Sequence, residues 1–365
     1  MELFVVCAPG LESVLASEME AVGFTPQIVA GGVATAGSLE DASRANLWLR
    51  TASRVLVRLG EVRATTFADF VRKARVLPFE TVVARGASVS FRVTCRKSRL
   101  YHSGAVAQRL HEALEARLGA SVSTATHDDE QESSSQLLLA RFDHDVCTVS
   151  ADTSGALLHR RGYRLAQSQA PLRETLAAAM LLAAGYTGTE ALLDPMCGSG
   201  TIPIEAALIA RRRAPGIARS FAFQQWPTYE ASAFETMRAR ALEQELRRAP
   251  AAIAGSDVDP DAIAAARENA GRAGVEGDLR VDVAAMRDIV PPAGHGLIVT
   301  NPPYGIRVRA DLPRLYADLA DLARSSGYRV AALVADVRAA RHAPIPWKPL
   351  LRTQNGGVRV ELLAT

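Results

Sequence analysis

The chain has 365 residues, of which 48% are hydrophobic and 22% are charged. At roughly 100–200 residues per domain, this length predicts two or three domains with hydrophobic cores, and it excludes a wholly disordered chain. The net charge is only +3, from 42 basic and 39 acidic residues, which excludes a uniformly basic surface but not a local basic face. Residues 44–117 hold such a local excess, with 15 Lys or Arg against 5 Asp or Glu.

The cysteines and the apolar runs indicate where the protein resides. Cys7, Cys95, Cys147 and Cys197 form no CxxC pair, so neither a disulfide framework nor a zinc site is predicted. The N-terminus lacks the basic region of a signal peptide, and the longest apolar run falls short of the ~18 residues that a membrane-spanning helix needs. We therefore expect a cytoplasmic protein with no membrane partner.

The first 165 residues are expected to form two small α+β units, one from residue 1 to 63 and the other from 64 to 165. Period-two and helical spacing of apolar residues define their elements. The predicted strands cover residues 3–7, 27–29, 33–35, 55–62, 89–95, 137–141 and 146–151, and the predicted helices cover 11–22, 39–50 and 105–118.

From residue 166 to 365, strand-like runs alternate with helical ones, which predicts a parallel, doubly wound sheet. The predicted strands are 191–193, 253–255, 279–281, 297–300 and 330–335. Asn355-Gly356 then separates two further β-like runs, and Asn-Gly is the strongest short hairpin signal. A parallel sheet that ends in an antiparallel hairpin is the expected shape of a Rossmann-like class I methyltransferase domain.

The first motif that carries chemistry is LLDPMCGSGT at residues 192–201, followed by an apolar helix. A strand, a tight glycine turn and a helix N-terminus offer backbone N–H groups to a ligand. The third glycine of a dinucleotide motif is missing, and the next acidic strand end, Asp257, lies well beyond the roughly 20 residues of that motif. A carboxylate there can accept both ribose hydroxyls of an adenosine. Asp282, after the third strand, is equally well explained as an acceptor for the adenine amine or as a solvated acid.

The second motif is Asn301-Pro302-Pro303-Tyr304, which directly follows the fourth strand, at the end where ligands of parallel sheets bind. An exocyclic amine of a nucleobase is a poor nucleophile, because its lone pair is delocalised into the ring. The Asn301 side-chain oxygen and the Pro302 carbonyl can hold both amine protons, so that the lone pair turns toward a methyl sulfonium. Tyr304 offers a stacking face for the base. This chemistry needs no cysteine nucleophile and no metal.

Together these motifs resemble the THUMP-domain RNA guanine-N2-methyltransferases, and most of all their bacterial 23S rRNA (large-subunit) branch. Residues 194–201 and 301–307 carry the catalytic half of the resemblance. The N-terminal half resembles the ferredoxin-like plus THUMP arrangement of that family at residues 46–52, 96–103, 152–155 and 158–164, and residues 171–177 resemble its helix before the sheet.

The resemblance implies a fold and a set of functional residues. Residues 1–63 would be a ferredoxin-like domain, 64–165 a THUMP RNA-binding domain and 166–365 an S-adenosylmethionine-dependent methyltransferase domain. The implied cofactor residues are Asp194, Gly198, Gly200, Asp257 and Asp282. The implied guanine-binding residues are Asn301, Pro302 and Tyr304. The residues expected to contact RNA are Arg96, Lys97, Arg99, Arg160, Arg161 and Arg164.

Other functions stay open on the sequence alone. A tRNA guanine-N2-methyltransferase would use the same catalytic motif beside a THUMP unit. DNA adenine-N6 methylation would fit the motif at 301–304 but would leave the N-terminal half unexplained. A non-enzymatic RNA-binding assembly factor would not need the intact glycines or Asn301.

Three local features also have two readings. The basic residues at 96–99 are an RNA-facing cluster or a solvated turn. His159 is better explained as a surface histidine than as a phosphate contact. The aromatic segment at residues 220–227 either walls the base pocket or belongs to an insertion packed against a sheet.

Overall fold

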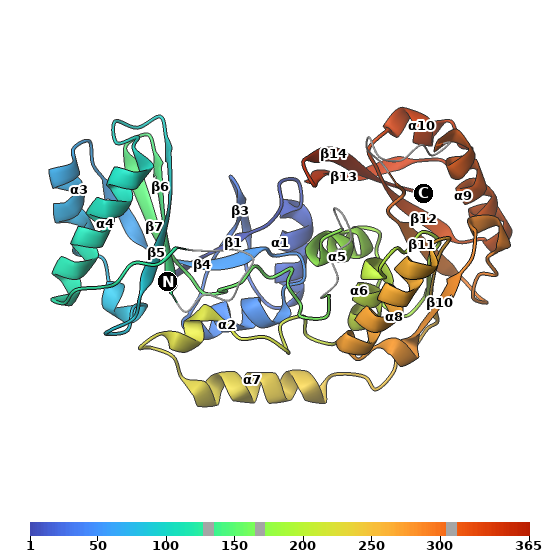
Figure 1. Cartoon of the computed structure of the whole chain (residues 1–365), viewed down its shortest axis with the longest axis horizontal. Helices are drawn as coiled ribbons and strands as arrows, with labels where there is room; N and C mark the ends of the chain where they lie inside the picture. The colour runs from blue at the N-terminus through green and yellow to red at the C-terminus, as the bar shows by residue number, and fades with distance from the viewer. Residues whose placement is uncertain (127–134, 165–171, 304–311) are drawn as a thin grey trace.

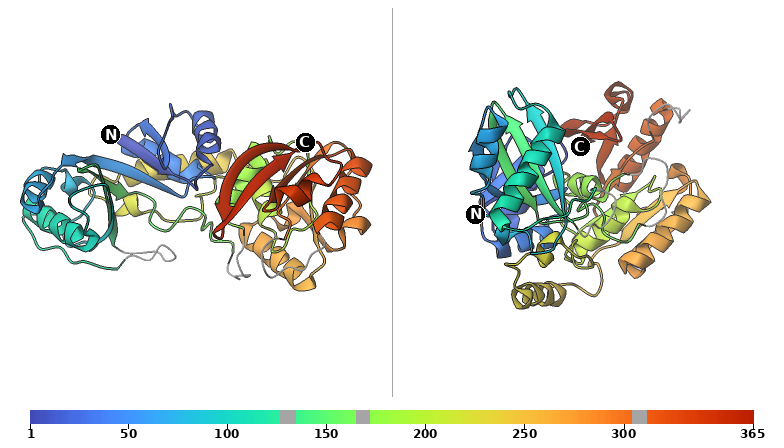
Figure 2. Two further views of the ribbon diagram at one scale, coloured as in Figure 1. Left: turned by 90° about the horizontal axis from the view of Figure 1, so that it is seen from above. Right: turned by 60° about the vertical axis from the view of Figure 1, so that its left-hand side comes forward.

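In the computed structural model, residues 1–126, 135–164, 172–303 and 312–365 are described, and they build two seven-stranded sheets (Figure 1). The first sheet has the order β2-β3-β1-β4-β7-β6-β5 and the second the order β10-β9-β8-β11-β12-β14-β13. We call residues 1–164 the N-terminal module and residues 172–365 the C-terminal domain. The two lie side by side in an elongated molecule (Figure 2), and the α/β class is confirmed.

The N-terminal module follows the predicted order of elements. Its strands are β1 (Glu2–Val6), β2 (Gln27–Val29), β3 (Gly32–Ala36), β4 (Arg54–Arg63), β5 (Val89–Arg96), β6 (Gln136–Asp143) and β7 (Val146–Asp152). Its helices are α1 (Glu12–Ala21), α2 (Leu39–Trp48), α3 (Phe67–Ala74) and α4 (Ser103–Leu118). The short helix α3 was not predicted. Helix α2 ends two residues earlier than predicted, because the chain turns so that the backbone N–H of Arg50 reaches the Glu18 carboxylate.

One continuous sheet runs through both of the predicted α+β units. Strand β4 pairs with β1 through its first residues and with β7 from Leu56 onward, across a bulge between Arg58 and Gly60. The boundary predicted near residue 63 therefore falls at the end of a strand that both units share. The division of residues 1–165 into two domains stays a prediction.

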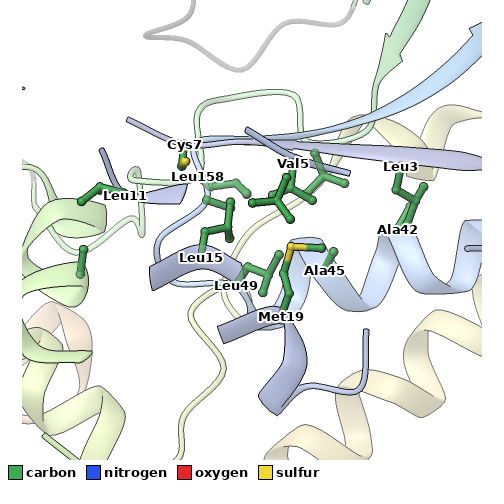
Figure 3. Packing of buried hydrophobic residues seen from close by; sticks show 14 of the residues in the cluster. Leu3, Val5, Cys7, Leu11, Leu15, Met19, Ala42, Ala45, Leu49 and Leu158 are labelled. Carbon is green, nitrogen blue, oxygen red and sulfur yellow. The ribbon is translucent and has the colours of Figure 1, made fainter. Parts of the chain in front are cut away.

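The core of the N-terminal module lies between its sheet and helices α1 to α4, and α1 and α2 cover the half of the sheet around β1. Alternate residues of β1 point to opposite faces of the sheet, as strand geometry requires. Leu3 and Val5 face the helices and pack with residues such as Leu15 and Met19 (Figure 3). Phe4 belongs to a smaller cluster on the opposite face.

The C-terminal domain has the doubly wound sheet and the closing hairpin that its sequence predicts. Its strands are β8 (Ala191–Asp194), β9 (Ile253–Asp257), β10 (Leu279–Val283), β11 (Gly296–Thr300), β12 (Arg329–Val334), β13 (Lys348–Asn355) and β14 (Val358–Ala364). Its helices are α5 (Glu174–Ala183), α6 (Thr201–Ala210), α7 (Ala231–Glu243), α8 (Pro260–Ala273), α9 (Leu312–Ser326) and α10 (Val337–Arg341). Strands β8 to β12 are parallel, whereas β14 is antiparallel to both β12 and β13. Among the described residues, no helix is both long enough and apolar enough to cross a bilayer.

The segment between α6 and β9 leaves the C-terminal domain and packs against the N-terminal module, where α7 runs beneath α2 (Figure 1). Phe223 packs edge-on against Phe234, with ring centroids 5.1 Å apart, and both rings are buried. The indole N–H of Trp226 donates to the side-chain oxygen of Gln136 over 2.6 Å. The aromatic segment at 220–227 is therefore part of an insertion packed against the N-terminal module, and it does not wall the candidate active site.

Charged side chains join the two halves of the molecule. The guanidinium of Arg50 donates to the carbonyl of Arg213 over 2.7 Å, and the guanidinium of Arg161 donates to the carbonyl of Arg50 over 2.6 Å. Arg161 also lies 3.5 Å from the fully buried carboxylate of Glu205, while the half-buried Glu18 accepts the backbone N–H of Arg50. We call these four side chains, Glu18, Arg50, Arg161 and Glu205, the charged junction.

A second contact between the halves is made by Gly10, in the turn after β1. Its φ is +87°, and a Cβ built there would lie 1.7 Å from the carbonyl oxygen of Arg352 in β13. Only a residue without a side chain allows this approach, so the turn and the hairpin are held in direct backbone contact.

Gly10→Ala should therefore destabilise the protein by about 3 kcal/mol or more, because both the strained φ and the clash with the hairpin must be relieved. Gly23→Ala is the matched control: Gly23 has the same φ of +87°, but a Cβ there meets nothing within 4 Å. That variant should lose only about 1 kcal/mol. Urea unfolding of both variants measures the difference, and equal losses would show that the contact with the hairpin contributes nothing.

Candidate active site

A cavity of about 720 Å³ opens at the carboxyl ends of the parallel strands in the C-terminal domain. The segments that follow β8, β9, β10 and β11 line it, together with the first turns of α9. Its volume lies within the roughly 300–1,000 Å³ of small-molecule sites. The glycine motif at 192–201 and the motif at 301–304 were both predicted to lie at this edge, and their described residues line one cavity.

Asp194, at the end of β8, joins the two motifs. Its side chain is buried, and one carboxylate oxygen accepts the Thr300 hydroxyl over 2.8 Å and the backbone N–H of Met196 over 3.2 Å. Thr300 is the last residue of β11, so this bond holds the first motif beside Asn301. Burial raises the pKa of Asp194 to about 7 from its ordinary value near 3.8.

Gly198 and Gly200 have different positions in the turn that follows. Gly198 lines the cavity, and a Cβ on it would meet nothing within 4 Å. Gly200, with φ of +85°, is not among the residues lining the cavity, and its Cβ would lie 3.0 Å from Ala266 of α8. Gly198 thus leaves space in the cavity beside its Cα, whereas Gly200 allows α6 and α8 to approach closely.

Asp257 ends β9 and also lines the cavity. One of its oxygens accepts the backbone N–H of Gly198 over 2.9 Å, and the other accepts the N–H of Asp259 over 3.1 Å. Each oxygen keeps a further lone pair, so the carboxylate can still accept hydroxyls of a ligand in the cavity.

Asn301 follows β11 and lines the same cavity. Its side-chain oxygen is buried and accepts no hydrogen bond from any described residue. Pro303 lines the cavity beside it, while Pro302 is buried. Tyr304 and the rest of its motif, through Arg307, lie outside the described residues.

Asp282 is not brought into the cavity. Its side chain is half exposed, and it accepts the Nε–H of Arg280 over 2.7 Å. The segment after β10 lines the cavity instead with Ala285, Met286 and Arg287. Of its two sequence-based readings, the placement supports the solvated acid.

The residues expected to contact RNA fall into two groups. Arg96, Lys97, Arg99 and Arg160 are exposed. Arg161 is buried in the charged junction, so its expected contact with RNA is not supported, because its guanidinium already serves the carbonyls of Leu158 and Arg50.

Two neighbouring side chains, Arg164 and His159, also differ from the surface positions that the sequence suggested. The guanidinium of Arg164 donates to the carbonyl of Leu172 and to the buried carboxylate of Glu174, so it too is used inside the protein. His159 is buried rather than exposed, and burial together with the charge of Arg173 lowers its pKa to about 3.

Helix α9 contributes residues that the sequence patterns did not reveal. Arg314, Leu315 and Asp318 line the cavity from its first turns. Asp318 follows Leu315 by three residues and Arg314 by four, and this shared helix face after the second motif is the signal that could have found them.

Comparison with known proteins agrees with this geometry. Residues 161–340 match the family model described as "RMKL-like, methyltransferase domain", and residues 2–56 match the "RlmL ferredoxin-like domain". A "Putative RNA methyltransferase" from Synechocystis sp. is 34% identical over 84% of this chain and 80% of its own length. The chain belongs to the RMKL-like methyltransferase family.

Other relatives of this RMKL-like methyltransferase differ in length and in name. The "Ribosomal RNA large subunit methyltransferase K/L" from Syntrophotalea carbinolica is 37% identical over the whole chain, which spans 53% of that relative. The chain thus spans about half the length of this K/L protein.

Solved structures match almost throughout. A "putative methyltransferase complexed with SAH" has a TM-score of 0.88 at 27% identity, covering 100% of this chain and 97% of that one. A "predicted N6-adenine-specific DNA methylase" from Listeria monocytogenes has a TM-score of 0.87 at 30% identity, covering 99% and 95%.

The raised pKa of Asp194 makes a pH-dependent prediction. The folded state favours the protonated carboxyl of Asp194. The contribution of this carboxyl to the free energy of unfolding is therefore complete below pH about 4 and is lost as the pH rises to about 7. Asp194→Asn cannot ionise but keeps an acceptor for Thr300. Its free energy of unfolding relative to wild type should rise by about 2–3 kcal/mol between pH 5 and pH 8, measured by urea unfolding. A difference that does not change with pH would contradict the assignment.

Proposed function

We propose that this chain is an S-adenosylmethionine-dependent methyltransferase that methylates the exocyclic N2 of a guanosine in 23S rRNA. The observation that carries the proposal is the side-chain oxygen of Asn301, which is buried at the cavity without a donor among the described residues. Leaving such an acceptor unpaired costs roughly 1–3 kcal/mol, so the position favours a ligand that donates to it. An exocyclic amine is such a donor.

The residues of the cavity fit the cofactor. Gly198 has no side chain to fill the cavity, and Asp257 retains acceptor capacity for ribose hydroxyls. Asp194 supports the turn between them, and Gly200 supports it through packing with α8. S-adenosylmethionine supplies an electrophilic methyl group on a sulfonium. The solved relative complexed with SAH supports this choice.

The protein's part in the reaction is orientation. The Asn301 oxygen and the Pro302 carbonyl would accept the two amine hydrogens, which turns the nitrogen lone pair out of the ring system and toward the methyl group. The same two oxygens would stabilise the positive charge that develops on the nitrogen as the N–C bond forms and the S–C bond of the sulfonium breaks. The methylated nitrogen would then lose one hydrogen as a proton to solvent, which gives the neutral N2-methylguanosine. Pro302 and Pro303 restrict the backbone, so the carbonyl keeps its direction. Tyr304 would stack on the base.

The choice of 23S rRNA rests on the K/L relatives and on the exposed basic residues of the N-terminal module. Arg96, Lys97, Arg99 and Arg160 would contact phosphates from a THUMP domain at residues 64–165, with a ferredoxin-like domain at 1–63 before it. Such a substrate implies a cytoplasmic enzyme. The second candidate, tRNA, is favoured only by the shared catalytic motif.

Transfer of labelled methyl groups tests the substrate. The full chain is incubated with labelled S-adenosylmethionine and with rRNA, tRNA or DNA from a strain that lacks the gene. We expect label in 23S rRNA, recovered as N2-methylguanosine after digestion. Label confined to tRNA would overturn the substrate, and N6-methyladenine would overturn the base.

Asn301→Ala should lower kcat by about 10²–10³-fold, because one of the two acceptors for the amine is lost. Its dissociation constant for S-adenosylmethionine, measured by calorimetry, should stay within about threefold of wild type, since the cofactor residues are untouched. Loss of cofactor binding in this variant would contradict the assigned role.

Asp257→Ala is the contrasting variant. It should weaken S-adenosylmethionine binding by about tenfold or more, because the charge-assisted hydrogen bonds to the ribose are removed. Unchanged affinity would show that Asp257 does not contact the ribose.

A further inference from the structure

The C-terminal hairpin extends beyond the edge of the sheet at which the candidate active site lies. Thr300 of β11 pairs with Ala332 of β12, and Val334 at the end of β12 pairs with Glu361 of β14. Three more residues of β14, back to Val358, continue past that level. At about 3.3 Å per residue, the hairpin tip projects roughly 10 Å beyond the edge.

The hairpin is also close to the catalytic motif. Strand β12 alone separates β11 from β14. Two strand spacings of about 4.8 Å put β14 roughly 10 Å from the position where Asn301 leaves the sheet. A nucleic-acid strand with its target base in the cavity therefore reaches the hairpin within a few nucleotides.

One face of this hairpin is polar and basic. Arg352 pairs in register with Glu361, and Gln354 pairs with Arg359, so all four side chains share a face. Thr353, on the opposite face, is buried. Residues 336–365 carry five Lys or Arg against two Asp or Glu, an excess as large as the net charge of the whole chain.

A cleft of about 470 Å³ lies beside this face. The N-terminal module lines it with the turn at Pro9 and Gly10, and the C-terminal domain lines it with the end of β12 and with both arginines of the hairpin. The cleft is thus formed between the two halves of the molecule, next to the catalytic edge.

The two arginines are available to an anion. Arg359 is exposed and forms no ion pair with a described residue. Arg352 has a side chain that is 76% exposed, and its contact with Glu361, at 3.0 Å, is a surface ion pair that contributes little to stability. Guanidinium groups bind phosphate through paired N–H donors.

We infer that the hairpin is an RNA-binding element: Arg352 and Arg359 hold phosphates of the substrate strand next to the target nucleotide, in the cleft between hairpin and N-terminal module. This rests on the proposed function for the identity of the strand. The hairpin thereby joins the active site to the basic residues of the N-terminal module and fixes the path of the RNA between them.

The double variant Arg352→Ala/Arg359→Ala tests this in the full chain. In vitro transcribed 23S rRNA is the probe for affinity, and methyl transfer to it gives KM and kcat. We expect the dissociation constant and KM for RNA to rise about tenfold, with kcat at saturating RNA and the affinity for S-adenosylmethionine within about twofold of wild type. The slope of log affinity against log salt should fall by about 1–2, because one or two phosphate contacts are lost.

Two control variants accompany it. Arg324→Ala removes an exposed arginine in the last turn of α9 that is likewise paired with an acid, Asp321, and that lines neither the cavity nor the cleft, so it should leave RNA affinity unchanged. Arg352→Lys/Arg359→Lys keeps the charges and should restore most of the affinity.

Unchanged RNA affinity and salt dependence in the double variant, or an equal loss in Arg324→Ala, would overturn the inference. A loss seen only with ribosomal particles, and not with protein-free RNA, would also overturn it and assign the hairpin to a protein partner. If the wild-type chain methylates no RNA, the proposed function fails, while the RNA dissociation constants still decide the role of the hairpin.

Discussion

The arrangement of the two halves depends on charges that neither half could bury alone. Arg50 and Arg161 come from the N-terminal module and Glu205 from the C-terminal domain, and Arg161 contacts both Arg50 and Glu205. Removing a charge from water is costly unless an opposite charge and hydrogen-bond partners replace the water. Glu18 and Glu205 balance the two arginines, so the junction is favourable only when the halves meet in one orientation. That orientation brings the Gly10 turn onto the hairpin.

The shape of the cavity depends on hydrogen bonds to two carboxylates, those of Asp194 and Asp257. Asp194 joins the ends of β8 and β11, and Asp257 joins the turn after β8 to the end of β9. Both are side chains placed at strand ends, where they tie segments that are far apart in the sequence. These bonds use hydroxyl and N–H groups of the two motifs, whereas the side-chain oxygen of Asn301 accepts no hydrogen bond from a described residue. That difference is the basis for proposing that the substrate donates to Asn301.

Local signals in the sequence were enough for the C-terminal domain. The strand, glycine turn and helix at 191–210 and the Asn355-Gly356 hairpin are each encoded within at most twenty consecutive residues, so pattern and turn chemistry predict them. The failures concern partners distant in sequence. Arg161 lies in a basic stretch that is typical of a surface. Only the fold shows that its guanidinium donates to the carbonyl of Arg50 and lies beside the carboxylate of Glu205. The pairing of β4 with both β1 and β7 could not be predicted either, because the sequence of β4 indicates a strand but not its partners.

The insertion that carries α7 has a consequence for how the chain folds as it is synthesised. The seven described strands of the N-terminal sheet are complete at Asp152, so this module leaves the ribosome before the C-terminal domain does. Yet the side-chain oxygen of Gln136 accepts the indole N–H of Trp226, and the backbone carbonyl of Thr153 accepts the backbone N–H of Phe223. The module therefore acquires these two buried contacts only after some 70 further residues have been translated. The N-terminal sheet is accordingly an early but incomplete folding unit, finished by a segment of the domain that follows it.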